Sequence, residues 1–348
     1  MTDKPCHLKG LFIRENGDLF PCCRSAFSDE MIIGNLNDKN LFKKLIDFNK
    51  TCSCSGINLV QGTKDDIDYD MFNLELSYLC QATCSMCCVD APNHPTPYNE
   101  TFYSKIENLI KELKPKNILV QGGEILVQED SMRWLESLKT NYPKLTISII
   151  TNGNYIKALD KVKKTFDSVC VSIVGFQSET YKNIMGLDIE KTKSFCENIA
   201  KCTEINHLAL KYLLTPTNVQ DLPLFIDWAM SINPNNIIIQ DSCLEQYIIL
   251  NTNDKYWEKT FLRTKKEFTK VIKKRIAQEE SSDYKFKIEF YNNSLHYFEL
   301  DDEYIKSNKF ETIVSLLKNN PTVSRPIPTA NKERSFSKKI KLLCKSRF

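Results

Sequence analysis

The chain has 348 residues, which is enough for one large domain with a smaller one, or for two domains. Hydrophobic residues make up 42% and charged residues 26%, as in ordinary globular proteins, and the net charge of +3 predicts no nucleic-acid partner. No apolar run approaches roughly 18 residues and the first residues have no apolar core, so we expect a cytoplasmic protein without a membrane span.

Residues 1–65 are predicted to form a small cysteine-rich module. The stretch Leu11–Cys22 predicts a β-hairpin, because two apolar runs flank Asn16-Gly17, a frequent turn dipeptide. Ile32–Asn37 then leads into a short helix predicted over Leu41–Phe48. Cysteines precede the hairpin, follow it and close the module: Cys6, Cys22, Cys23, Cys52 and Cys54.

The cysteines are distributed unevenly along the chain. Nine of the 14 fall within residues 6–88. Without an export sequence, this number argues for metal or cluster ligation in a reducing compartment rather than for a disulfide framework. Later cysteines in apolar or helical contexts, namely Cys170, Cys196 and Cys202, are predicted to be buried structural thiols.

Three cysteines stand close together at the spacing C-x3-C-x2-C: Cys80, Cys84 and Cys87. They follow residues 71–79, where apolar and polar side chains alternate as in a strand. Thiolates are the usual ligands of iron–sulfur clusters, and three ligands for four irons leave one iron open to bind a small molecule.

Two other interpretations of the triplet stay open at this point. Cys84 and Cys87 form a C-x2-C pair that Cys52 and Cys54 could complete to four zinc ligands. The three cysteines could also be a purely structural group.

Residues 66–280 alternate predicted strands and helices, the pattern of a parallel sheet covered by helices. The six predicted strands cover residues 71–79, 117–121, 144–150, 168–174, 207–214 and 236–240. The predicted helices cover residues 98–113, 131–140, 156–165, a helical stretch to about 202, 219–231 and 255–279.

Polar or small residues follow every predicted strand. In barrels built from alternating strands and helices, the functional residues lie at these carboxyl ends of the strands. The second strand ends in Gly122-Gly123-Glu124, and paired glycines let a backbone approach a ligand closely. Asn152, Ser172 and Cys243 lie at or near later strand ends.

Residues 281–348 are predicted to form a C-terminal extension. A strand over 286–290 and a helix over 304–317 precede a basic tail, which we expect to be mobile.

The cysteine triplet resembles the radical S-adenosylmethionine (SAM) enzymes. In that family the open iron binds the amino and carboxylate groups of SAM, and one electron from the cluster releases a 5′-deoxyadenosyl radical that abstracts a hydrogen atom from the substrate. The resemblance implies a [4Fe-4S] cluster on Cys80, Cys84 and Cys87. It also implies SAM contacts at Met86, Gly122, Gly123, Glu124, Asn152 and Ser172.

The N-terminal module resembles the SPASM and twitch auxiliary-cluster modules of the same family, although here it precedes the core instead of following it. The resemblance implies a second [4Fe-4S] cluster on Cys6, Cys22, Cys52 and Cys54, with Cys23 as the alternative to Cys22. A zinc ribbon with the same ligands is the other interpretation.

The expected fold is α/β, a partial (β/α)6 barrel of the radical SAM type with this small module in front. The expected function is reductive SAM cleavage and hydrogen abstraction from a sugar, small metabolite or peptide, in an enzyme of oxidoreductase or epimerase type served by a flavodoxin or ferredoxin. Cys243 is the candidate hydrogen donor. The alternatives are an iron–sulfur electron-transfer protein without catalysis and a zinc-binding interaction protein.

Overall fold

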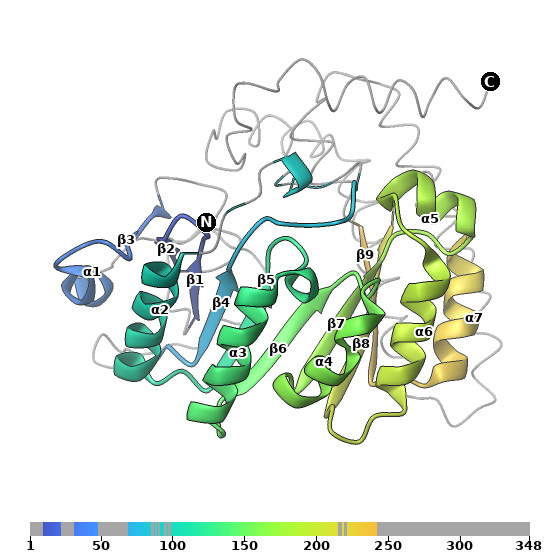
Figure 1. Cartoon of the computed structure of the whole chain (residues 1–348). Helices are drawn as coiled ribbons and strands as arrows, with labels where there is room; N and C mark the ends of the chain where they lie inside the picture. Colours follow the sequence, from blue (N-terminus) through green and yellow to red (C-terminus); the bar gives the residue numbers. More distant parts are fainter. Residues whose placement is uncertain are drawn as a thin grey trace, which may run out of the picture.

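The protein is described by a computed structural model, which covers residues 10–21, 31–47, 69–84, 87, 89, 91–93, 96, 99–214, 218 and 221–241. Within these residues the strands form one mostly parallel sheet in the order β3-β2-β1-β4-β5-β6-β7-β8-β9 (Figure 1).

Six consecutive parallel strands make up the centre and one end of this sheet. Each pairs in parallel with the next strand along the chain. They are β4 (Met71–Glu75), β5 (Asn117–Gln121), β6 (Thr146–Thr151), β7 (Ser168–Ile173), β8 (His207–Leu214) and β9 (Asn236–Asp241). The predicted α/β fold with six parallel strands is confirmed, and the arrangement is consistent with a partial barrel.

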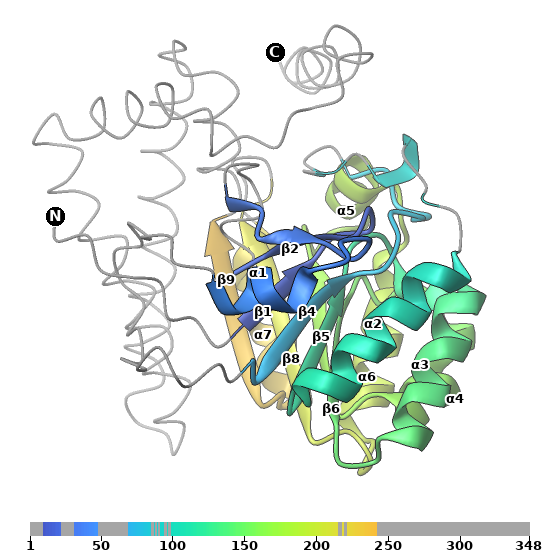
Figure 2. The same ribbon diagram turned by 90° about the vertical axis from the view of Figure 1, so that its left-hand side faces the viewer.

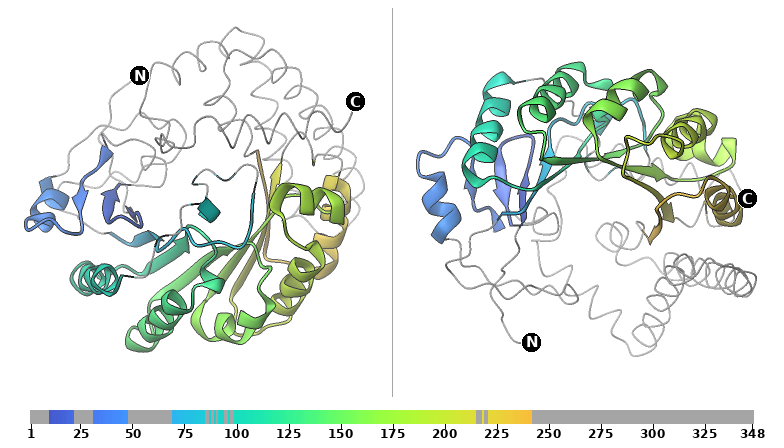
Figure 3. Two further views of the ribbon diagram at one scale, coloured as in Figure 1. Left: turned by 45° about the horizontal axis from the view of Figure 1, so that its top comes forward. Right: turned by 90° about the horizontal axis from the view of Figure 1, so that it is seen from below.

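Helices cover one side of the curved sheet (Figure 3). They are α2 (Glu100–Leu113), α3 (Glu129–Asn141), α4 (Leu159–Thr165), α5 (Ser178–Met185), α6 (Ile189–Ala200) and α7 (Leu222–Ile232), with short 3-10 turns η3 (Ala91–Asn93), η4 (Ile125–Val127) and η5 (Ile156–Ala158). The helical stretch expected up to residue 202 is two helices, because Gly186 adopts φ 72° and ends α5.

Along each strand, successive side chains point to opposite faces of the sheet. On β5, Ile118 and Val120 are fully buried against the helices, whereas Leu119 and Gln121 on the opposite side are only half-buried. We call this opposite side the inner face. The main hydrophobic core therefore lies between the sheet and its helices.

The predicted N-terminal hairpin is confirmed, and it joins the same sheet. The strands β1 (Gly10–Ile13) and β2 (Asp18–Phe20) pair antiparallel, with Phe12 opposite Phe20. Strand β1 also pairs in parallel with β4, next to which it lies in Figure 2. A two-residue strand, β3 (Gly34–Asn35), and helix α1 (Leu41–Asp47) complete this part.

The predicted domain limits at residues 65 and 280 lie outside the described residues and stay predictions. The same holds for the helices expected over 255–279 and 304–317, the strand over 286–290 and the basic tail. Each helix in the described part of the chain is too short or too polar to cross a bilayer.

Candidate functional site

The cysteine loop, residues 80–87, leaves the carboxyl end of β4. Cys80, Cys84 and Cys87 are all free thiols and all partly exposed. The Ala82 backbone N–H donates to Cys80 Sγ at 3.4 Å, and the Ala91 backbone N–H donates to Cys87 Sγ at 3.4 Å. Hydrogen bonds to sulfur favour the thiolate that binds iron, so the donor set and its surroundings fit a cluster.

Burial raises the pKa of the Cys80 thiol to about 11, although the hydrogen bond from Ala82 opposes this shift. The thiol is therefore protonated at neutral pH in the metal-free chain. Metal ligation requires the thiolate, so loading of this site releases a proton.

The two glycines after β5 pack directly on the segment that leads into the cysteine loop. A Cβ atom at Gly122 would lie 2.8 Å from the Ser77 carbonyl oxygen, and one at Gly123 would lie 2.2 Å from that of Leu79. The backbone N–H groups of Gly123 and Glu124 donate to these same carbonyl oxygens, each at 2.8 Å. The glycines thus permit a backbone-to-backbone contact that fixes the start of the loop.

This contact also explains why β4 is shorter than expected. The strand was predicted to run to residue 79 but ends at Glu75. The carbonyl groups of Ser77 and Leu79 accept hydrogen bonds from the turn after β5 instead of continuing the ladder, and Gln128 Nε2 adds a further bond to Leu79 at 2.9 Å.

Glu124 is buried, and its carboxylate points into the protein. Its oxygens accept hydrogen bonds from Thr151 Oγ1 at 2.7 Å, from the Asn152 backbone N–H at 2.7 Å and from the Leu126 backbone N–H at 3.2 Å. Burial raises its pKa, which these bonds oppose. Glu124 therefore ties the end of β5 to the end of β6 and acts as a positioning residue.

Two further contacts hold the cysteine loop from the other side. Gln81 Nε2 donates to Asn152 Oδ1 at 3.2 Å, and the Thr83 backbone N–H donates to the Met185 carbonyl oxygen at 2.8 Å. A Cβ atom at Gly186 would lie 2.3 Å from Thr83 Oγ1. The loop is thus anchored on the ends of β5, β6 and α5.

The structure brings most of the described site residues to one rim of the sheet. The cysteine loop, Gly122–Glu124 and Asn152 are joined by the hydrogen bonds above. Ser172 lies on the inner face of β7, opposite Lys211 of β8 in the register. Met86, Cys243 and the proposed auxiliary ligands Cys6, Cys22, Cys23, Cys52 and Cys54 lie outside the described residues.

In the part of the chain that the structure describes, no three His, Cys, Asp or Glu side chains converge on a single metal ion. Ligands of a four-iron cluster each bind a different iron, so their sulfurs need not converge in this way. Of the thiols predicted to be buried, Cys196 is fully buried, whereas Cys170 and Cys202 are only half-buried, so the prediction was wrong for those two.

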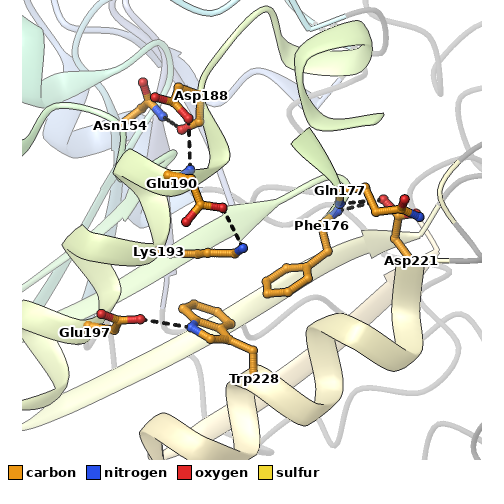
Figure 4. Close-up of polar contacts among 9 residues, drawn as sticks. All are labelled: Asn154, Phe176, Gln177, Asp188, Glu190, Lys193, Glu197, Asp221 and Trp228. Carbon is orange, nitrogen blue, oxygen red and sulfur yellow. Dashed lines mark hydrogen bonds and ion pairs between the residues drawn. The ribbon is translucent and has the colours of Figure 1, made fainter. Parts of the chain in front are cut away.

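Asp221 is a further candidate, fully buried, that no sequence pattern indicated. Its carboxylate accepts hydrogen bonds from the backbone N–H groups of Phe176 at 2.9 Å and Gln177 at 3.0 Å, and from Gln177 Nε2 at 2.7 Å (Figure 4). It thus joins the start of α7 to the turn between β7 and α5. An acidic residue directly before a Leu-Pro helix start was visible in the sequence, but it suggests a cap of its own helix.

Comparison with known proteins places the site in a family context. Residues 74–229 match the model of the Radical SAM superfamily. A protein of Methanococcus vannielii named "Probable GTP 3′,8-cyclase" is 29% identical over 130 residues, which cover 37% of this chain and 43% of that protein. The protein of the same name from Sulfolobus acidocaldarius is 26% identical over 168 residues, 47% of this chain and 53% of that protein. The chain thus spans about half the length of these relatives.

Similar solved structures include Streptococcus suis SuiB bound to S-adenosylmethionine, with a TM-score of 0.43 and 13% identity, covering 49% of this chain and 40% of SuiB. Another is anSMEcpe with bound AdoMet and the Cp18Cys peptide, with a TM-score of 0.41 and 19% identity, covering 60% of this chain and 58% of that chain.

Proposed function

We propose that this chain is a radical SAM enzyme, which cleaves SAM reductively and abstracts a hydrogen atom from a sugar, small metabolite or peptide. The observation that carries the proposal is the anchoring of the cysteine loop on the Gly122–Glu124 turn, at the carboxyl edge of a parallel sheet. The match of residues 74–229 to the Radical SAM superfamily supports it independently.

Each residue has a specific part in this proposal. Cys80, Cys84 and Cys87 hold a [4Fe-4S] cluster whose open iron binds SAM. When bound, this cluster supplies the electron that breaks the sulfur–carbon bond of SAM. The backbone of Gly122 and Gly123 borders the SAM amino group, and Glu124 keeps that backbone against the loop.

Asn152 and Ser172 are proposed to contact the ribose or carboxylate of SAM. The Asn152 side chain already accepts from Gln81 and from the Asn154 backbone N–H, at 3.2 and 2.9 Å. Its orientation is therefore set before SAM binds, and it joins the proposed SAM site to the cysteine loop. Met86 is proposed to cover the adenine.

The N-terminal cysteines extend the proposal. Cys6, Cys22 or Cys23, Cys52 and Cys54 are proposed to bind a second [4Fe-4S] cluster that transfers an electron or holds the substrate. A flavodoxin or ferredoxin would supply electrons. Cys243 is the proposed hydrogen donor if the reaction is an epimerisation; a Cys243→Ala variant that forms the same product would refute that role.

The names of the two relatives above refer to a GTP 3′,8-cyclase. This chain matches about half of the length of each relative, so their names do not identify its substrate. The proposed substrate class is therefore a sugar, a small metabolite or a peptide. An iron–sulfur electron-transfer protein and a zinc-binding protein are the rival functions that the experiment below must exclude.

The test is anaerobic reconstitution with iron and sulfide, followed by metal analysis and by an assay for 5′-deoxyadenosine with SAM and dithionite. We expect about eight irons per chain from two four-iron clusters, and 5′-deoxyadenosine formation that is lost in Cys84→Ala. Cys202→Ala is the matched control, because this half-buried thiol lies after α6, away from the loop. Bound zinc, or iron without SAM cleavage, would overturn the proposal.

A further inference from the structure

The inner face of the sheet carries few charges. Among the described side chains that β4–β9 present on this face, most are neutral, and the charged ones are Glu75 and Lys211. His207 also lies on this side, at the exposed amino end of β8. The two charged residues lie on β4 and β8, four strand positions apart in the sheet order, which is roughly 19 Å along the sheet.

Lys211 points away from the helices. Its neighbours on β8, Leu210 and Tyr212, are fully buried, and the Tyr212 ring packs on Phe225 of α7 with the ring centroids 4.7 Å apart. Because side chains alternate along a strand, Lys211 lies on the inner face. The ammonium group acts there on Cys170 of β7, where it opposes the burial that raises the pKa of this thiol.

Lys211 is half-buried, and no hydrogen bond or ion pair joins it to another described residue. Two other partly buried lysines, Lys139 and Lys193, have charged partners. Lys139 donates to both carboxylate oxygens of Asp167 at 2.9 and 2.7 Å. Lys193 pairs with Glu190 at 2.8 Å and lies 4.3 Å from the Phe176 ring centre (Figure 4).

A half-buried ammonium group with no counter-charge among the described residues has lost part of its hydration without an ion pair there to compensate. A bound anion would restore this balance. We propose that Lys211 binds an anionic group of the substrate, a phosphate or a carboxylate, inside the partial barrel. This inference rests on the proposed function and narrows its substrate class to anionic molecules.

The place of Lys211 favours the substrate over SAM. The cysteine loop and the Gly122–Glu124 turn lie at the ends of β4 and β5, and Asn152 follows β6. Strand β8 is two positions beyond β6 in the sheet, about 10 Å away. Ser172 of β7, the last of the SAM contacts proposed above, is the register neighbour of Lys211, so the test below also measures the affinity for SAM.

The test measures anion binding to the reconstituted, SAM-loaded protein by anaerobic calorimetry, with pyrophosphate and succinate as the phosphate and carboxylate probes. The variants are Lys211→Met, which removes the charge, Lys211→Arg, which keeps it, and Lys193→Met as the control on the helical side. A charge-assisted hydrogen bond corresponds to about a 10- to 100-fold change in affinity.

We expect one probe to bind the wild type, to bind Lys211→Met about 10- to 100-fold more weakly, and to retain its affinity in Lys211→Arg and Lys193→Met. The same probe should slow alkylation of Cys170 in the wild type but not in Lys211→Met, because the anion cancels the field of the ammonium group. Circular dichroism checks that each variant is folded.

Equal probe binding in wild type and Lys211→Met, or none in the wild type, would overturn the assignment. So would a tenfold loss of affinity for SAM itself in Lys211→Met, which would place the SAM carboxylate on this lysine. Iron content and 5′-deoxyadenosine are measured on the same wild-type protein. A failure there overturns the proposed function, whereas SAM cleavage without anion binding overturns only the role of Lys211.

Discussion

Replacement of Gly123 by alanine should damage the cysteine loop without touching a cysteine. The new Cβ atom would lie 2.2 Å from the Leu79 carbonyl oxygen, whereas real Cβ atoms essentially never come within 3.0 Å of such an atom. The two backbone segments must therefore separate by about 0.8 Å or more. Because both partners are backbone, no side-chain rotation can relieve the clash.

The cost follows from the contacts that this separation disrupts. Overpacking costs about 1–3 kcal/mol. The two hydrogen bonds from Gly123 and Glu124 to Ser77 and Leu79, each 2.8 Å long, contribute about 0.5–1.5 kcal/mol each. We expect Gly123→Ala to lower the free energy of unfolding by about 2–6 kcal/mol, and to reduce the iron content, since Cys80 directly follows the displaced segment.

The assay is anaerobic urea unfolding of the reconstituted protein, followed by tryptophan fluorescence, together with iron analysis. Gly10→Ala is the matched control, because a Cβ atom there would lie 3.8 Å from its nearest neighbours. The reasoning is refuted if Gly123→Ala unfolds within about 0.5 kcal/mol of Gly10→Ala and binds as much iron.

Three further substitutions test the supports of the site. Asp221→Ala leaves the backbone amide donors of Phe176 and Gln177 unpaired and should lower the free energy of unfolding by about 2–4 kcal/mol. Asp221→Asn should be closer to wild type. Glu124 has a raised pKa, so the folded state binds its proton more tightly than the unfolded chain does, and stability falls as pH rises from its ordinary pKa of 4.5 through the folded pKa. Glu124→Gln removes this dependence, so the difference in unfolding free energy between wild type and Glu124→Gln should shrink from pH 5 to pH 8. Gly186→Ala should reduce iron binding by displacing Thr83, and Thr83→Ala in the same chain should restore part of it, because it removes the clash with Thr83 Oγ1 but leaves the alanine at φ 72°.

The changes at Asp221 and Glu124 each have a control. Asp160→Ala and Glu112→Gln alter exposed acidic residues of α4 and α2 and should leave unfolding unchanged within about 0.5 kcal/mol. An unfolding free energy of Asp221→Ala equal to that of Asp160→Ala would contradict the role of Asp221 in holding the turn between β7 and α5. If the difference in unfolding free energy between wild type and Glu124→Gln is the same at every pH, Glu124 is not a buried carboxylate that titrates. If the effects of Gly186→Ala and Thr83→Ala on iron binding are additive, the two residues are not in contact.

The parallel sheet could be predicted from the sequence because each strand carries its own pattern. Ile118 and Val120 alternate with less buried residues, and the same period recurs along β6 and β7. The helix split at Gly186 was not foreseen, since the period of α5 and α6 does not reveal that one glycine takes φ 72°. Local patterns specify elements more reliably than they specify where an element ends.

The contacts that build the site were harder to predict from the sequence. The sequence indicated Gly122-Gly123-Glu124 as a ligand cradle, but the close approach of its backbone to residues 77–79 joins segments more than 40 positions apart. The bonds from Gln81 to Asn152 and from Asp221 to the turn after β7 also join distant segments. No spacing rule connects such residues, because their proximity depends on the three-dimensional packing of several strands.

The pairing of β1 with β4 has a consequence for handling the protein. Without the hairpin, β4 would become an edge strand, with the backbone groups that now face β1 open to other chains, and such edges promote aggregation. The hairpin instead places β3, only two residues long, at the end of the described strand order. Removal of the first 40 residues to obtain a minimal barrel would therefore yield an aggregation-prone fragment, and a useful expression strategy keeps the hairpin attached.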